Sequence, residues 1–177
     1  MGPIYYQKGD SQAGREGENG VMYQIHKDLL DAFTAAPEVY TALLRDCTQE
    51  QATAARGGDE NWSVVEVMCH LREAEERGLE RMRAMRDQDN PFMPGYDQDE
   101  WARERNYATG NLREAFDAFL RFRASHVAEL AALTPEQWER PGTHEEQGQI
   151  NIWGQTLHLV SHDTSHAAQI ARQLAGE

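Results

Sequence analysis

Apolar residues recur at helical spacing in four long stretches, and no stretch shows the strict alternation of a β-strand. The four stretches span residues 22–46, 63–86, 111–133 and 151–175. Pro37 lies inside the first and is expected to break or kink it. The pattern predicts an all-α protein, an antiparallel four-helix bundle with a long crossover between helices 2 and 3.

Capping residues support these boundaries. Ser63 and Glu66 have the spacing of a capping box at the start of the second helix. Thr134 and Gln137 have the same spacing at the start of a short helical turn, and Gly176 follows the fourth helix. A weak internal repeat accompanies them, because TQEQ and TPEQ each precede a tryptophan and then a histidine, His70 and His162 respectively. This repeat indicates two related helical hairpins.

Two segments lack helical periodicity. Residues 8–20 are polar and rich in glycine, so we expect an extended N-terminal arm at 1–21 ahead of a bundle domain at 22–177. Residues 87–108 form the crossover, with a short helix expected around Trp101. Either segment can cover the mouth of a site in the bundle.

Charge and composition narrow the function. The chain of 177 residues has 17 Lys and Arg against 30 Asp and Glu, a net charge of -13 that repels nucleic acid and anionic membranes. No apolar run approaches the roughly 20 residues of a membrane span. Cys47 and Cys69 give no disulfide framework, and the first residues do not have the pattern of a signal peptide. We therefore expect a cytoplasmic protein that binds neither nucleic acid nor membrane.

Histidines supply the candidate chemistry. His158, His162 and His166 repeat every four residues and share one face of the last helix. Two imidazoles at this spacing can bind one metal ion, and His70, on the inward side of the second helix, is the leading third ligand. Three neutral imidazoles leave coordination positions open for water or substrate. On spacing alone, a hydrogen-bonded histidine without a metal is the alternative for each.

The remaining histidines and the acidic residues near His70 are mainly expected to lie on the surface. Three histidines without a spacing partner are expected to be solvated: His26, His126 and His144. His158 is expected to neighbour a ligand or lie on the surface. Glu73, Glu75 and Glu76 indicate a solvated face, although Glu73 lies one turn from His70 and is a possible base or extra ligand.

Three further residues lie close to the candidate ligands in sequence. Asp163 is rotated away from the metal and is expected to support a ligand or face solvent. Gln169 either bonds a metal-bound water or satisfies the core. Cys69 is expected to be a buried, inert thiol.

Two motifs together give a family resemblance. WSVVEVMCHLREAE, from Trp62, and HLVSHDTSHAAQI, from His158, resemble the DinB/YfiT-like superfamily of metal-binding four-helix bundles over about residues 30–174. The resemblance implies that His70, His162 and His166 bind a divalent metal. It also implies either a transferase or isomerase that uses bacillithiol, mycothiol or a related thiol, or a hydrolase.

We therefore expect a metal-dependent enzyme acting on a small molecule, by S-transfer from a low-molecular-weight thiol or, next, by hydrolysis. Imidazole ligands favour Zn²⁺ or Ni²⁺, with Mn²⁺ and Fe²⁺ as alternatives. The competing hypothesis is a non-catalytic metal-binding, stress-associated or interaction protein. Phe92, Tyr96 and Trp101 exceed what a four-helix core is expected to bury, which predicts a homodimer.

Overall fold

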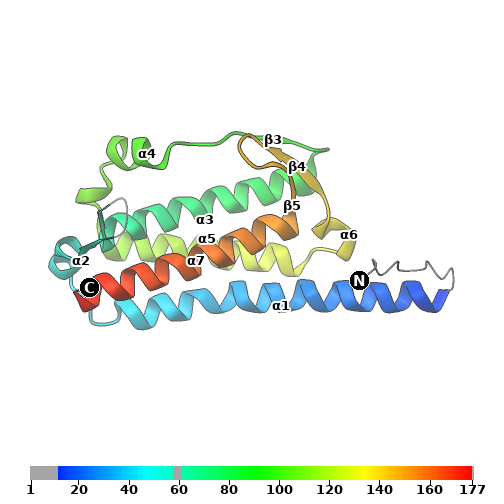
Figure 1. Cartoon of the computed structure of the whole chain (residues 1–177), viewed down its shortest axis with the longest axis horizontal. Helices are drawn as coiled ribbons and strands as arrows, with labels where there is room; N and C mark the ends of the chain where they lie inside the picture. The colour runs from blue at the N-terminus through cyan, green and yellow to red at the C-terminus, as the bar shows by residue number, and fades with distance from the viewer. Residues whose placement is uncertain (1–11, 58–60, 177) are drawn as a thin grey trace, which may run out of the picture.

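The structure, a computed structural model, describes residues 12–57 and 61–176. Within these residues the long helices are α1 (Gln12–Leu44), α3 (Val64–Asp87), α5 (Leu112–Ala131) and α7 (Ile152–Ala175). The short helical segments are α2 (Gln49–Ala54), α4 (Gln98–Glu104), η1 (Tyr107–Thr109) and α6 (Pro135–Trp138). The long helices pack side by side (Figure 1), which confirms the predicted all-α four-helix bundle.

The crossover determines the direction of the helices. From the end of α3 it runs back along the bundle through α4 to the opposite end (Figure 1). Neighbouring helices α3 and α5 therefore run parallel, as do α1 and α7, whereas α3 and α7 are antiparallel. The predicted antiparallel packing thus holds for α3 with α7. The expected short helix around Trp101 is present as α4.

Two small β-sheets lie at the ends of the bundle, although no strands were predicted. One pairs β1 (Arg56–Gly57) with β2 (Trp62–Ser63). The other has the order β3 (Phe92–Met93), β4 (Pro141–His144) and β5 (Gly148–Asn151), with β3 parallel to β4. Strands of two to four residues are too short to produce a recognisable alternation, so the prediction missed them.

The first helix corrects two predictions. Residues 12–21, predicted as part of an extended arm, belong to α1, and residues 1–11 lie outside the described part of the chain. Glutamine, arginine and glutamate between the glycines favour helix, and adding turns to an existing helix costs less than starting one. Pro37 does not break α1. Proline cannot donate to the carbonyl of Phe33, and Arg123 from α5 donates to that oxygen instead, at 2.9 Å.

The two halves of the described chain repeat one order of elements. Each has a long helix, a short capped helix, a β-hairpin and a second long helix. Thr48 and Thr134 cap the short helices α2 and α6 through complete capping boxes. The two hairpins that follow are β1–β2 and β4–β5. The weak sequence repeat is therefore a structural one.

Helix caps give the register of this repeat. Ser63 caps α3 and Asn151 caps α7. His70 lies seven residues after its cap and His158 lies seven residues after its own. Within the repeat, His70 is therefore equivalent to His158, and the alignment of His70 with His162 is wrong. The tryptophans used for that alignment lie on opposite sides of the two caps.

Ring contacts between the long helices follow the same repeat. Tyr40 and His126 each lie eight residues before the cap of the following short helix. The Tyr40 ring meets Phe119 edge-on, with centroids 5.5 Å apart, and the His126 ring meets Phe33 edge-on at 5.0 Å. The halves are therefore related by a pseudo-twofold arrangement, with each half contributing to the other's packing.

Of the helices within the described ranges, none is both long and apolar enough to cross a membrane.

Candidate metal centre

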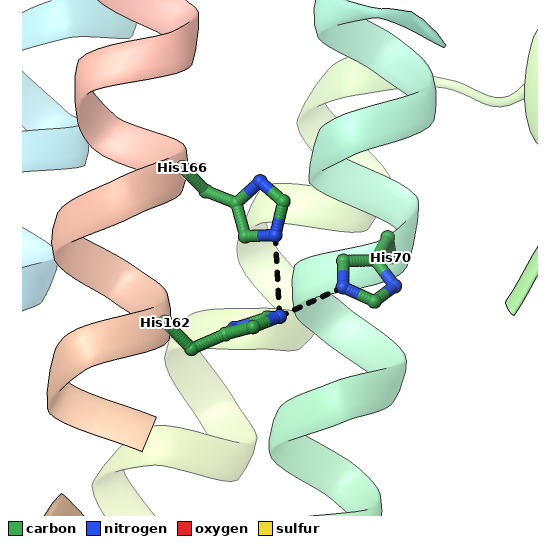
Figure 2. A group of neighbouring side chains, drawn as sticks. All are labelled: His70, His162 and His166. Carbon is green, nitrogen blue, oxygen red and sulfur yellow. Dashed lines mark hydrogen bonds between the residues drawn. The ribbon is translucent and has the colours of Figure 1, made fainter. Parts of the chain in front are cut away.

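Three imidazoles from two antiparallel helices converge in the bundle (Figure 2). His162 Nε2 lies 2.8 Å from His70 Nε2 and 3.2 Å from His166 Nε2. Tetrahedral coordination with bonds of about 2.0–2.1 Å separates ligand nitrogens by about 3.3 Å. The predicted grouping of the three histidines is therefore present, and its spacing fits a single small metal ion.

Local structure fixes the positions of these side chains. The Ser63 cap starts α3 and holds His70 on the face that meets α7. The Trp62 ring packs against the His70 ring with centroids 5.2 Å apart. His162 and His166 are one helical turn apart on α7, so their rings project to the same side.

Burial favours the neutral form of His70 and His162. It lowers the pKa of His70 to about 3, with a further contribution from the neighbouring His166. It also lowers the pKa of His162 well below the ordinary value, and the nearby histidines add to the shift. A metal competes with protons for the imidazole lone pair, so neutral rings favour metal binding near neutral pH.

Two of the three imidazoles, those of His70 and His162, border a cleft of about 860 Å³. His70, His158 and His162 contribute to its lining. Residues 95–98 of the crossover form part of one wall, and residues 145–147 of the β4–β5 turn form part of another. The crossover therefore borders the site without filling it, which leaves the space that a small substrate requires.

Comparison with known proteins identifies the family. The profile of the DinB superfamily matches residues 32–170. The chain belongs to the DinB superfamily. It is 30% identical over 139 residues to the Oceanobacillus iheyensis protein named "Putative metal-dependent hydrolase OB0782", covering 76% of this chain and 77% of that protein.

A solved structure shows the same fold as this DinB-superfamily chain. It is that of YfiT from Bacillus subtilis, described as "a probable metal-dependent hydrolase with an unusual four-helix bundle topology". The TM-score is 0.76 at 18% sequence identity, and the match covers 98% of this chain and 93% of YfiT. The resemblance to the DinB/YfiT-like superfamily is thereby confirmed.

Two further histidines line the cleft of this DinB-superfamily protein. His158 is exposed, outside the triad, with its ring centroid 6.1 Å from that of His162. His144 was predicted to be solvated but is only 4% exposed. Its Nδ1 accepts the backbone N–H groups of Glu146 and Gln147 at 3.2 and 3.4 Å, so its proton resides on Nε2. Burial and the nearby Arg81 lower the pKa of His144.

A buried charge network lies behind the triad, and sequence reasoning missed it. Arg123 Nη2 donates to Glu75 Oε2 at 2.7 Å and to Asp163 Oδ2 at 2.8 Å. His126 Nδ1 lies 2.9 Å from Glu75 Oε1. All four residues are buried, which contradicts the solvated face predicted for Glu75 and the solvated ring predicted for His126. Asp163 thus points away from the triad, as expected, but into the core.

Two carboxylates share one guanidinium in this network, and their pKa values shift in opposite directions. Burial raises the pKa of Asp163 to about 6, although Arg123 acts in the opposite direction. Burial also acts to raise the pKa of Glu75, but the hydrogen bond with His126 and the charge of Arg123 lower it overall. Asp163 is therefore the carboxyl group of the network that takes up a proton first as the pH falls.

The remaining candidates have structural partners. Glu73 is buried and forms ion pairs with Arg72 and Arg105, so it anchors the crossover instead of facing solvent. Cys69 is buried as predicted, and burial raises its pKa. His26, predicted to be solvated, is buried and stacks on Trp138 with ring centroids 5.0 Å apart.

Proposed function

We propose that the protein is a metal-dependent hydrolase of small molecules. The observation that carries this proposal is the convergence of three imidazoles, two of which, His70 and His162, line an open cleft. A closed structural site uses four protein ligands, whereas a catalytic site keeps a position for water or substrate. The names of the Oceanobacillus iheyensis and Bacillus subtilis relatives support hydrolysis.

The donor set limits the choice of metal. His70, His162 and His166 would hold it through Nε2, and an all-imidazole set favours Zn²⁺ or Ni²⁺ over Mg²⁺ or Ca²⁺. We retain Mn²⁺ and Fe²⁺ as alternatives. When bound, such a metal lowers the pKa of a water or thiol so that a nucleophile exists near neutral pH.

Two residues of the chain are suited to act on the substrate. His144 offers Nε2–H as a fixed hydrogen-bond donor in the cleft wall, because its Nδ1 is held by backbone N–H groups. His158 lines the cleft and is exposed, so a bound substrate can reach its imidazole. Together the two residues place a fixed hydrogen-bond donor and a second imidazole beside the triad.

Metal-dependent turnover tests this function. Zinc-loaded and nickel-loaded protein should hydrolyse at least one substrate among chromogenic carboxylic esters, anilides and phosphate diesters. The variant with His162→Ala and His166→Ala should lose the activity, because it cannot retain the metal. Activity that persists in this variant, or that is absent for every substrate and metal, would contradict the proposal.

Thiol S-transfer is the second candidate. A cleft of about 860 Å³ lies toward the upper end of the range for small-molecule sites, so it has room for a thiol beside an electrophile. Metal-loaded protein assayed with bacillithiol, mycothiol and related thiols against monochlorobimane should then show thioether formation above the spontaneous rate. Hydrolysis without thioether formation would favour the first candidate.

The non-catalytic alternative predicts a site plugged by the crossover. Residues 95–98 instead border the cleft, which supports an enzyme. Absence of metal-dependent turnover with every ester, anilide, phosphate diester and thiol tested would favour the alternative.

We also propose a homodimer in the cytoplasm. The rings of Tyr96 and Trp101 stack on each other within the chain, with centroids 4.3 Å apart, so these two residues support a dimer less than expected. Phe92 is 65% exposed and remains available for a dimer interface. Light scattering at micromolar concentration should give twice the mass of one 20.1 kDa chain. Phe92→Gln should shift the measured mass toward that of one chain. A single-chain mass for the unaltered protein would contradict the dimer.

A further inference from the structure

Helix α7 carries buried glutamines that bond to the backbone of neighbouring elements. Gln155 Nε2 donates to the carbonyl of Gly78 at 2.7 Å. Gln169 Nε2 donates to the carbonyl of Gly57 at 3.3 Å, and Gln173 Nε2 donates to the same oxygen at 3.1 Å. Each of these glutamines is less than 9% exposed. They therefore form a set with matched environments and matched donor bonds.

The other end of the amide distinguishes Gln169. The Oε1 atoms of Gln155 and Gln173 are buried without a hydrogen-bond partner among the described residues. Gln169 Oε1 lies 2.7 Å from Nδ1 of His166, one turn earlier on α7. Gln169 is thus the member of the set whose amide connects the backbone to the triad.

Hydrogen-bond chemistry fixes the direction of this connection. The carbonyl of Gly57 can only accept, so the NH₂ group of Gln169 must face it. Gln169 Oε1 then faces His166 and can only accept, so His166 Nδ1 must carry the proton. The lone pair of a neutral His166 therefore lies on Nε2, the atom that meets His162.

We propose that Gln169 is a positioning residue that holds His166 in the metal-binding tautomer and orientation. The β1–β2 hairpin is its support, because the Gly57 carbonyl orients the amide. The same hairpin provides Trp62, whose ring packs on His70. One small hairpin thus sets two of the three imidazoles, one from each helix.

This inference rests on the proposed metal function, and zinc affinity tests it. Gln169→Met keeps the volume but removes the acceptor for His166 Nδ1–H. Partners of this kind typically account for 10–100-fold in metal affinity. Competition with a chromophoric chelator should show zinc binding to Gln169→Met weakened by about that factor.

A matched variant separates positioning from general stability. Gln155→Met removes a buried amide from α7 that donates to the Gly78 carbonyl, away from the β1–β2 hairpin and from the triad. It should keep zinc affinity within about threefold of the unaltered protein, below the range for a ligand partner.

Nitrogen-15 NMR of the histidine rings gives a readout independent of metal affinity. The unaltered protein without metal should show His166 protonated at Nδ1, and Gln169→Met should lose this preference while Gln155→Met keeps it. Equal zinc affinity in Gln169→Met and Gln155→Met, or His166 protonated at Nε2 in the unaltered protein, would overturn the proposal. If the unaltered protein binds no zinc, the metal function fails, and the NMR comparison alone then decides the role of Gln169.

Discussion

Replacing His162 and His166 together with alanine is expected to reduce the bound metal from about one ion per chain to background. The two substitutions leave His70 as the remaining imidazole of the triad, and one neutral ligand cannot hold a divalent ion against water. Helical content should stay near normal, because both residues are half-buried and alanine favours helix. Elemental analysis of the purified protein, with circular dichroism on the same sample, measures both quantities.

His158→Ala is the matched control for this pair. His158 is on the same helix, one turn before His162, and lies outside the triad. The control should retain about one metal per chain. Full occupancy in the double variant would remove the triad as the metal centre, whereas loss of metal from His158→Ala would add a fourth ligand to it.

The second large effect is expected at Arg123. Arg123→Met should lower the free energy of unfolding by about 3–5 kcal/mol, because it leaves the Glu75 and Asp163 carboxylates without their buried cation. It also removes the donor to the Phe33 carbonyl. Single domains have only about 5–15 kcal/mol of stability, so the variant should be partly or fully unfolded at 37 °C. Urea denaturation followed by circular dichroism measures the change.

Arg121→Met is the control, since Arg121 is exposed on the same helix. Its effect should be within about 0.5 kcal/mol. The loss of unfolding free energy in Arg123→Lys should fall between those of Arg123→Met and Arg121→Met, because lysine keeps the charge without the planar group of five donors. A free energy of unfolding for Arg123→Met within 1 kcal/mol of the unaltered protein would show that the network contributes little to stability.

The long helices and the His162–His166 pair could be predicted from sequence because both depend on local spacing. Ser63, Asn111 and Asn151 cap α3, α5 and α7 close to the expected positions. His70 required more, since it lies 92 residues before His162 and spacing cannot show which helices meet. Its inward position on the second helix made His70 the leading candidate, and the family resemblance implied that it completes the ligand set.

The charge network could not be predicted, because each member appears solvated in its own segment. Glu75 lies within an acidic run, and nothing near it in sequence indicates that Arg123 comes to meet it from another helix. The same applies to His126, whose partner is Glu75. A charged residue can be buried when tertiary packing places an opposite charge beside it, and the sequence pattern around the residue does not indicate which distant segment provides that charge.

The pseudo-twofold arrangement has a consequence for how such a core can arise. Arg123 and Pro37 are equivalent positions, each eleven residues before the cap of the next short helix. Arg123 reaches Glu75 in one half and Asp163 in the other, so its guanidinium lies where the symmetry axis would pass. A dimer of identical half-length chains would bring two guanidinium groups to that point. Fusing the halves into one chain allows a single arginine on the axis, opposite a proline that leaves the carbonyl of Phe33 available to it.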